Sequence, residues 1–395
     1  MATAKLLESI HDNNTAFRLP ESVYDDNISK TYASILSKTN LTSTDAIEFD
    51  PYKHLSYYNT QAYPNAKSDY DATKTISMEQ LGLSQPDQIS ETGVSDPFPL
   101  FTEEAVEIMR QEILNKEIFM NFARYSYSST SGMDCVLRGY VKNDDKISTP
   151  FIYKAWSHPK TMELINKKAG VDLEIIMDYE IAHVNIAIKN DAMVEKELAI
   201  YNANNKVTKN TEDMPAVVGW HRDSYPFVCV LMLSDTTNMI GGETGLKTGT
   251  GEIAVVPGPK LGSAAILQGR MIEHIAKSPI GMTERITMVT SYRAKDPVKK
   301  DTSVLSTVKP ELNFGSRFHD FYNQWIDYRV ELIKQKLDIL NNTSRDDNGK
   351  FQKDDVMNQL KEIEAYVTKT YKEMEVSPEE WAKALKKHQR FDSFK

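Results

Sequence analysis

The chain has 395 residues, of which 40% are apolar and 26% charged, and its formal net charge is −9. This acidic balance argues against nucleic acid or an anionic membrane surface as the main partner, because both attract basic proteins. Two cysteines cannot build a disulfide framework, and neither a secretory signal nor an apolar run of bilayer length is evident. We therefore expect a cytoplasmic globular protein.

The first part of the chain predicts an irregular extension that wraps a core. Short helical patterns at residues 2–10 and 22–41 alternate with polar and turn residues. We expect three regions: the wrapping extension over residues 1–94, a core with its leading helices over 95–310, and a helical segment over 311–395.

Two helices are predicted at the start of the core. Thr102 is a good N-cap for a helix of about five turns, which extends to Phe122 at helical apolar spacing. A second helix is expected between Ser157 as its cap and Gly170 as its stop. Two helices ahead of a β-rich region predict helices packed on the outside of a sheet.

Between residues 173 and 293 the pattern becomes strand-like. Apolar and β-branched runs are separated by Gly, Pro and Asp turn signals, with no helical pattern between them. This predicts an antiparallel sandwich or barrel and excludes a doubly wound sheet. The predicted strands are residues 181–188, 217–223, 227–234, 252–256, 263–268 and 285–293.

Helical patterns return near the C-terminus. We predict helices over residues 318–337, 356–371 and 378–387, with a polar loop over 341–355. The apolar stripe of the first of these helices is typical of core or of a dimer interface. The fold class predicted from the residues is therefore α+β, mainly antiparallel β, with helices before and after the sheets.

Three residues in the β region predict a metal site. Side chains at i and i+2 of a strand point the same way, so His221 and Asp223 can share one ion. His274, 53 positions after His221, would supply a third ligand. About one His-x-acid triplet is expected by chance in this composition; here it follows a strand, and no other histidine has an acid at i+2.

Arg285 and Thr287 follow as a second functional pair. An arginine inside a barrel is costly unless an anion pairs with it. Arg285 with the Thr287 hydroxyl would suit the distal carboxylate of a dicarboxylate. The alternative is a structural ion pair between Arg285 and Glu284 or Asp296.

Four other residues are candidates for substrate or cosubstrate contacts. His183 and Asn185 share one face of a strand, where they are either satisfied core polar groups or neighbours of a cosubstrate. Tyr225 flanks the predicted ligands, where packing explains it better than substrate contact does. Arg293 lies on the same strand face as Arg285, eight positions on.

The pattern His-x-Asp, His, Arg-x-Thr over residues 215–296 resembles the Fe(II)/2-oxoglutarate-dependent oxygenases. The run Trp220–Val230 is similar to a fungal group within that family. The resemblance implies a double-stranded β-helix (jelly-roll) core, with iron held by His221, Asp223 and His274. It also implies that Arg285 and Thr287 bind the 5-carboxylate of 2-oxoglutarate, with Thr where many members have Ser.

The implied activity is oxidation of a C–H bond of a small organic substrate, with 2-oxoglutarate decarboxylated to succinate. The resemblance implies Fe(II), 2-oxoglutarate and O2, with ascorbate as a supporting reductant. Hydroxylation, desaturation and cyclisation remain open, as do the oligomeric state and the substrate, for which amino-acid-derived compounds are one class. Two alternatives remain: a non-haem iron oxidase that uses no 2-oxoglutarate, and an inactive jelly-roll binding protein.

Overall fold

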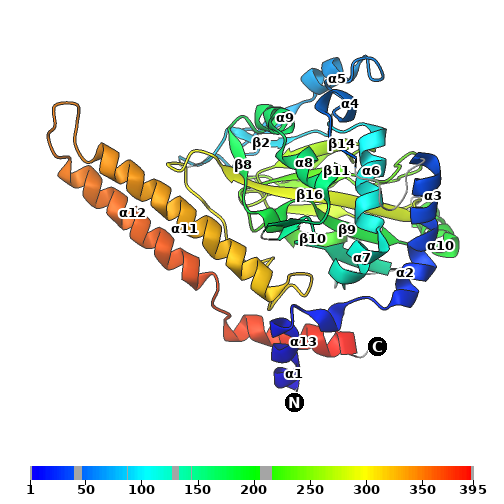
Figure 1. Ribbon diagram of the computed structural model, residues 1–395. Coiled ribbons are helices and arrows are strands. Elements are labelled where there is room, and N and C mark those ends of the chain that lie inside the picture. Colours follow the sequence, from blue (N-terminus) through cyan, green and yellow to red (C-terminus); the bar gives the residue numbers. More distant parts are fainter. Residues whose placement is uncertain are drawn as a thin grey trace.

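The computed structural model describes residues 2–39, 47–86, 88–126, 133–143, 145–204 and 216–392. Helices surround two antiparallel sheets, and a long helical hairpin projects from this body (Figure 1). The predicted mixture of helices and antiparallel sheet is confirmed. Within the described residues, no helix is both long and apolar enough to cross a membrane.

The larger sheet forms the centre of the body. Its neighbouring strands pair antiparallel throughout, and segments from the first hundred residues extend one edge. In spatial order the strands are β1 (Thr75–Ser77), β2 (Thr92–Ser95), β14 (Ser263–Leu267), β11 (Phe227–Met232), β16 (Glu284–Ala294), β9 (His183–Ile188), β5 (Met133–Leu137) and β4 (Ala123–Tyr125), while β3 (Phe98–Pro99) pairs with β14 and β8 (Leu173–Ile175) with β16.

The smaller sheet packs against one face of the larger one. An apolar cluster between them joins Val228 and Leu267 of the larger sheet to Leu246 and Val256 of the smaller. From β9 to β16 the chain alternates between the two sheets, except at the hairpin of β12 and β13. The order of the smaller sheet is β10 (Ala216–His221), β15 (His274–Lys277), β12 (Thr244–Lys247) and β13 (Ile253–Val256).

Helices cover the other face of the larger sheet. Ile286, Met288 and Tyr292, which alternate along β16, point into a large apolar cluster with Ile113 and Trp156 of these helices. This arrangement agrees with the expected helices outside a sheet. The helices of this layer and of the N-terminal segment are α2 (Glu21–Asn27), α3 (Ser29–Thr39), α4 (Pro51–His54), α5 (Ala66–Ala72), α6 (Glu103–Leu114), α7 (Lys116–Phe122), α8 (Pro150–Ser157) and α9 (Pro159–Ala169), with 3₁₀ turns at Thr15–Phe17 and Asp178–Glu180 and a small hairpin of β6 (Lys142–Asn143) and β7 (Lys146–Ile147).

Several predicted boundaries are wrong for local reasons. The helix predicted after Thr102 breaks at Asn115, whose side chain accepts the Glu117 N–H and so caps a new helix, α7. His158 rather than Ser157 caps α9, although Gly170 ends it as predicted, in the left-handed region. A helix that the sequence did not predict, α10 (Asp191–Asn204), lies between β9 and β10.

The N-terminal predictions hold in part. A helix over residues 2–10 appears as α1 (Ala2–His11), whereas the pattern over 22–41 divides into α2 and α3. Residues 40 and 41 of that prediction lie outside the described residues.

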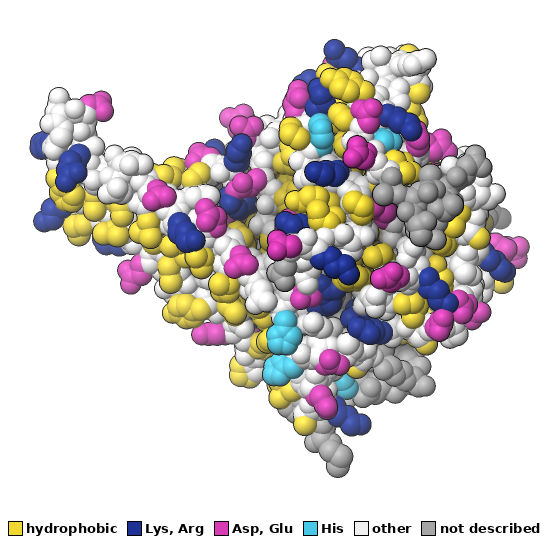
Figure 2. Space-filling model, viewed as in Figure 1, with side chains coloured by type: hydrophobic (Ala, Val, Ile, Leu, Met, Phe, Trp, Pro, Cys, Tyr) yellow, Lys and Arg dark blue, Asp and Glu magenta, His cyan; other side chains and the backbone are white. Residues whose placement is uncertain are grey.

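The predicted C-terminal helices are all present. Ser377 and Glu380 form the expected capping box, in which each backbone N–H donates to the other side chain, at 2.9 and 3.1 Å. The first two helices pair into the arm that projects from the body, and hydrophobic side chains are exposed along it (Figure 2). The three helices are α11 (Phe318–Thr343), α12 (Lys353–Lys372) and α13 (Pro378–Asp392), of which α13 packs on α1.

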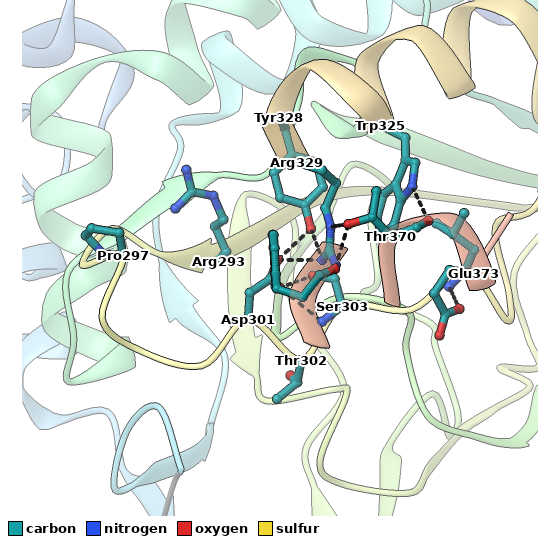
Figure 3. A network of polar contacts seen from close by, with 12 residues as sticks. Arg293, Pro297, Asp301, Thr302, Ser303, Trp325, Tyr328, Arg329, Thr370 and Glu373 are labelled. Atoms are coloured by element: carbon teal, nitrogen blue, oxygen red, sulfur yellow. Dashed lines mark hydrogen bonds and ion pairs between the residues drawn. The ribbon is translucent and has the colours of Figure 1, made fainter. Parts of the chain in front are cut away.

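A buried polar network fixes the base of this hairpin (Figure 3). Asp301, in the loop after β16, accepts hydrogen bonds from the hydroxyls of Tyr328 and Tyr366 at 2.7 Å and from Arg329 Nη1 at 3.0 Å. Arg329 also donates to the Thr370 hydroxyl at 2.8 Å. Burial alone would raise the pKa of Asp301, but Arg329 and its hydroxyl donors bring it below the ordinary value.

Because this network is buried, breaking its ion pair should lower the free energy of unfolding far more than breaking an exposed ion pair. Arg329→Met leaves the Asp301 carboxylate buried without its cation, and we expect it to lower the free energy of unfolding by about 3–5 kcal/mol. Lys53→Met, which breaks an exposed pair with Glu104, should change it little. Urea denaturation of both variants measures this, and equal effects would contradict the assignment.

Candidate metal centre

The pairing of β10 with β15 brings two histidines together at one end of the smaller sheet. His221, the last residue of β10, is the register partner of His274, the first residue of β15. Their ring centroids are 4.2 Å apart. Two residues 53 positions apart in the sequence therefore become neighbours through a single strand pair.

Backbone carbonyls fix the orientation of both rings. His221 Nδ1 lies 2.7 Å from the Gly219 carbonyl oxygen, and His274 Nδ1 lies 3.0 Å from that of Ile272. With Nδ1 as the donor, each ring leaves Nε2 unprotonated and available to a metal.

Asp223 completes the cluster from just beyond the strand. The predicted strand over residues 217–223 ends at His221, and the Asp223 N–H donates instead to the Gly269 carbonyl oxygen at 2.8 Å. The Asp223 carboxylate oxygens lie 3.4 Å from His221 Nε2 and 3.6 Å from His274 Nε2. Asp223 Oδ2 is buried and has no hydrogen-bond partner among the described residues.

This donor set suits one divalent transition-metal ion. The three ligand atoms all lie within 4.8 Å of one another. Two imidazole nitrogens and one carboxylate are the ligands of the facial site of non-haem Fe(II) enzymes, which leaves further coordination positions open. A buried carboxylate oxygen without a partner is costly, and a bound cation would remove that cost.

The pKa values of the two histidines shift in opposite directions. Burial lowers the pKa of His221, but the hydrogen bond and charge of Asp223 raise it above the ordinary value. Burial also lowers the pKa of His274, and here it outweighs Asp223, so the net pKa lies below the ordinary value. The more deeply buried ligand is therefore neutral near pH 7 and ready to coordinate.

Arg285 and Thr287 lie on the face of the larger sheet that is turned toward the smaller one. Together with Val289 they occupy every second position of β16 and therefore share one face of the strand. Val289 packs against the apolar cluster between the sheets. That cluster contains Leu246, the register partner of His274. The metal cluster and this pair therefore border the same interior.

Arg285 is in an unusual electrostatic position. Its Nε is buried and has no hydrogen-bond partner among the described residues. Burial lowers its pKa to about 10, while the charge of Asp134 acts in the opposite direction, so Arg285 remains charged at neutral pH. The alternative ion pair with Glu284 is wrong, because Glu284 pairs with Arg110 at 2.6 Å.

His183 and Asn185 also face this interior. They are the register partners of Val289 and Thr287, and directly opposite residues of antiparallel strands share a face. The Nε2 atom of His183 is buried without a hydrogen-bond partner in the described part of the chain. Burial, followed by the charge of Arg138, holds the pKa of His183 well below the ordinary value, so this ring is neutral.

Tyr225 and Arg293 make their contacts elsewhere. The Tyr225 hydroxyl donates to Glu180 at 3.0 Å, and its ring packs in an apolar cluster with α11. Arg293 forms an ion pair with its register partner Glu174 and lies over the ring of Tyr328. The structure thus groups His183 and Asn185 with Arg285 and Thr287. Tyr225 and Arg293 instead contact residues 174–180 and helix α11.

Two residues that the sequence did not single out shape this site. Gly269 passes so close to Asp223 that a Cβ there would lie 1.8 Å from Asp223 Oδ2. Asp134 lies on the interior face two strands from Arg285, since both are register partners of Ala187. In the sequence Gly269 reads as an ordinary turn glycine, and Asp134 carries no motif.

Comparison with known proteins places few constraints on this chain. No family model matches it and no curated protein matches it by sequence. Solved structures similar to it include an oxidoreductase of the 2OG-Fe(II) oxygenase family from Burkholderia pseudomallei (14% identity, 40% of this chain and 68% of that chain, TM-score 0.27). Others are prolyl 4-hydroxylases from Pseudomonas putida (14%, 51% and 93%, TM-score 0.30) and from Phytophthora capsici (9%, 88% and 96%, TM-score 0.33). At such TM-scores the similarity carries no argument.

The close approach at Gly269 gives a test of the metal centre. Gly269→Ala should displace the Asp223 carboxylate and weaken Fe(II) binding at least tenfold, as changes around metal ligands commonly do. Gly219→Ala is the matched control, because a Cβ there meets nothing within 4 Å. Anaerobic calorimetric titration with Fe(II) measures both, with Asp223→Ala as the reference for full loss. Unchanged binding in Gly269→Ala would contradict the geometry described here.

Proposed function

We propose that this protein is an Fe(II)- and 2-oxoglutarate-dependent oxygenase that oxidises a C–H bond of a small organic substrate. The observation that carries the proposal is the pairing of two features in one interior: a cluster of two histidines and one aspartate, and an arginine whose Nε is buried without a hydrogen-bond partner among the described residues. The first feature suits the metal and the second suits a dicarboxylate cosubstrate.

The proposed fold is the double-stranded β-helix. Support comes from the alternation of consecutive strands between two facing antiparallel sheets, from β9 to β16. A jelly roll is built from eight strands arranged in this way. In this interpretation the first metal ligand ends the second strand, the second ligand lies just beyond that strand, and the third begins the seventh.

His221, Asp223 and His274 would hold the iron. When bound there, Fe(II) supplies a redox-active centre with open positions for a cosubstrate and dioxygen. The contribution of the chain is to keep both Nε2 atoms pointed inward through the Gly219 and Ile272 carbonyls. These bonds hold both rings in the orientation that a shared ion would require.

Arg285 and Thr287 would hold the distal carboxylate of 2-oxoglutarate. A guanidinium can bind a carboxylate through two parallel hydrogen bonds, and the Thr287 hydroxyl, which is buried, can add a third. Burial strengthens these bonds, because little water competes with them. The ion pair would also remove the cost of keeping Arg285 charged in the interior.

His183 and Asn185 would line the same chamber beside the cosubstrate. The neutral His183 ring can donate or accept a hydrogen bond there without adding charge. The proposed overall reaction consumes 2-oxoglutarate, dioxygen and the substrate C–H bond and yields succinate, CO2 and the oxidised substrate, with ascorbate as a supporting reductant. Amino-acid-derived compounds are one class of substrate to test.

The direct experiment measures succinate released from 2-oxoglutarate in the presence of Fe(II), dioxygen and ascorbate. We expect slow release without substrate and faster release when a true substrate is added. Asp223→Ala should abolish both. Failure of the native protein to release succinate with any candidate, or without one, would overturn the proposal.

Substitution of Arg285 separates cosubstrate binding from iron binding. Arg285→Gln should weaken 2-oxoglutarate binding by about 100-fold, corresponding to about 3 kcal/mol for a charge-assisted hydrogen-bonded pair. Its Fe(II) binding should remain close to that of the native protein. Arg293→Gln is the control on the same strand, since Arg293 already pairs with Glu174. Equal losses of 2-oxoglutarate binding in the two variants, measured by anaerobic titration, would contradict the assignment of Arg285.

A further inference from the structure

The projecting hairpin has a second apolar face that no other described part of the chain covers. Along α11, Trp325, Arg329 and Leu332 are buried at spacings of four and three residues and contact α12 or the body. One position further along, at the same spacings, runs another row of apolar residues: Ile326, Val330, Ile333, Leu337 and Leu340. In this second row Ile326, Val330 and Leu337 are 36–43% exposed.

Helix α12 repeats this arrangement. Its buried row contains Ile363, Tyr366 and Thr370. One position further along each time lies a second row: Met357, Leu360, Glu364, Val367 and Tyr371. The four apolar members of that row are 43–51% exposed.

The two exposed rows lie on the same side of the hairpin. Successive residues of an α-helix are separated by about 100°, so each exposed row is rotated by that angle from its own buried row. Each buried row faces the other helix of the hairpin. Because the two helices run antiparallel, the same rotation along the chain has opposite senses in space, and both exposed rows therefore point to the same side of the hairpin. Apolar residues spaced alternately four and three apart are the pattern by which helices pack into bundles.

This face is large enough to be an interface. Seven large side chains exposed to this extent amount to roughly 500 Å² of apolar surface, a size at which exposed patches mark interaction sites. A standard interface buries about 800 Å² on each partner. The polar rim of the hairpin can supply the remainder.

The charges beside the face are complementary to one another. On the outer edge of α11, Asp327, Glu331 and Asp338 outnumber Lys334, whereas the outer edge of α12 carries Lys361 and Lys372. A second hairpin related by a two-fold axis along its length would bring the acidic edge of α11 against the basic edge of α12. Such an interface is self-complementary, as a symmetric dimer requires.

Glu364, the one charged residue inside the exposed rows, has Lys334 near its height. Arg329 bonds Thr370, and further along the arm Gln359 Nε2 donates to Thr343 at 3.2 Å, so positions 365–368 of α12 lie level with Lys334, about one helical turn or less from Glu364. A two-fold axis along the hairpin keeps these heights, so Lys334 on the outer edge of α11 in one copy would lie near Glu364 of the second copy.

We propose that this face, formed by the exposed rows of α11 and α12, binds the same face of a second copy of this chain and forms a four-helix bundle. The buried network at Asp301 holds the base of the hairpin to the body, so the face is presented in a fixed orientation. The dimer does not depend on the metal centre, and the two proposals can fail separately.

The test is the oligomeric state of the full chain by sedimentation velocity over a range of concentrations. We expect a dimer, and we expect Leu337→Glu combined with Leu360→Glu to weaken it at least 100-fold. Ile200→Glu on α10 is the matched control, a helical apolar residue that is 51% exposed outside the hairpin. It should leave the dimer intact, and melting curves check that every variant is folded.

Two outcomes would overturn the proposal. A monomeric native chain would do so, because no second copy would then cover the face. A dimer that persists in the Leu337→Glu, Leu360→Glu variant would place the contact elsewhere. A second measurement uses the fact that Cys135 and Cys229 are both buried. A spin label on Lys372→Cys should couple to that of a second copy, and no coupling in a dimer would exclude the hairpin face.

Discussion

The site depends on one strand pair and one close backbone contact. The pairing of β10 with β15 places His221 opposite His274, and the hydrogen bond from Asp223 N–H to the Gly269 carbonyl brings the carboxylate to both rings. Neither histidine reaches the other without this register, because a shift of one residue turns every side chain to the opposite face. The carbonyls of Gly219 and Ile272 then orient the rings, so the geometry is fixed by backbone groups rather than by flexible side chains.

Three arginines, Arg329, Arg293 and Arg285, show how differently a cation can be accommodated. Arg329 has a fully hydrogen-bonded carboxylate in Asp301, and Arg293 has an ion pair with Glu174. Both therefore act in packing the hairpin and the strand edge. Arg285 has a buried Nε with no partner among the described residues, and Asp134 offers it a charge from two strands away. This difference between the three arginines is the reason why we propose that the cosubstrate binds at Arg285.

Local patterns in the sequence predict much of this fold and part of the site. Capping residues and apolar periodicity give α9, α11, α12 and α13, because those signals act within a few residues. The strand pattern gives β9, β10, β11, β13, β14 and β16, but it does not give β12, β15 or the short strands before β9. The break at Asn115 and the helix α10 were not predicted, because a cap inside an apolar pattern and a helix whose apolar residues do not gather on one face give weak local signals. Gly269 and Asp134 matter through contacts with residues far away in the chain, which no local pattern encodes.

The central claim is that one iron ion and one molecule of 2-oxoglutarate share the interior between the two sheets. The most direct measurement is anomalous diffraction at the iron edge from crystals grown anaerobically with Fe(II) and 2-oxoglutarate. The account predicts a single iron peak bounded by His221, Asp223 and His274, with the distal carboxylate of 2-oxoglutarate on Arg285. An iron peak elsewhere, or none at these three residues, would contradict it.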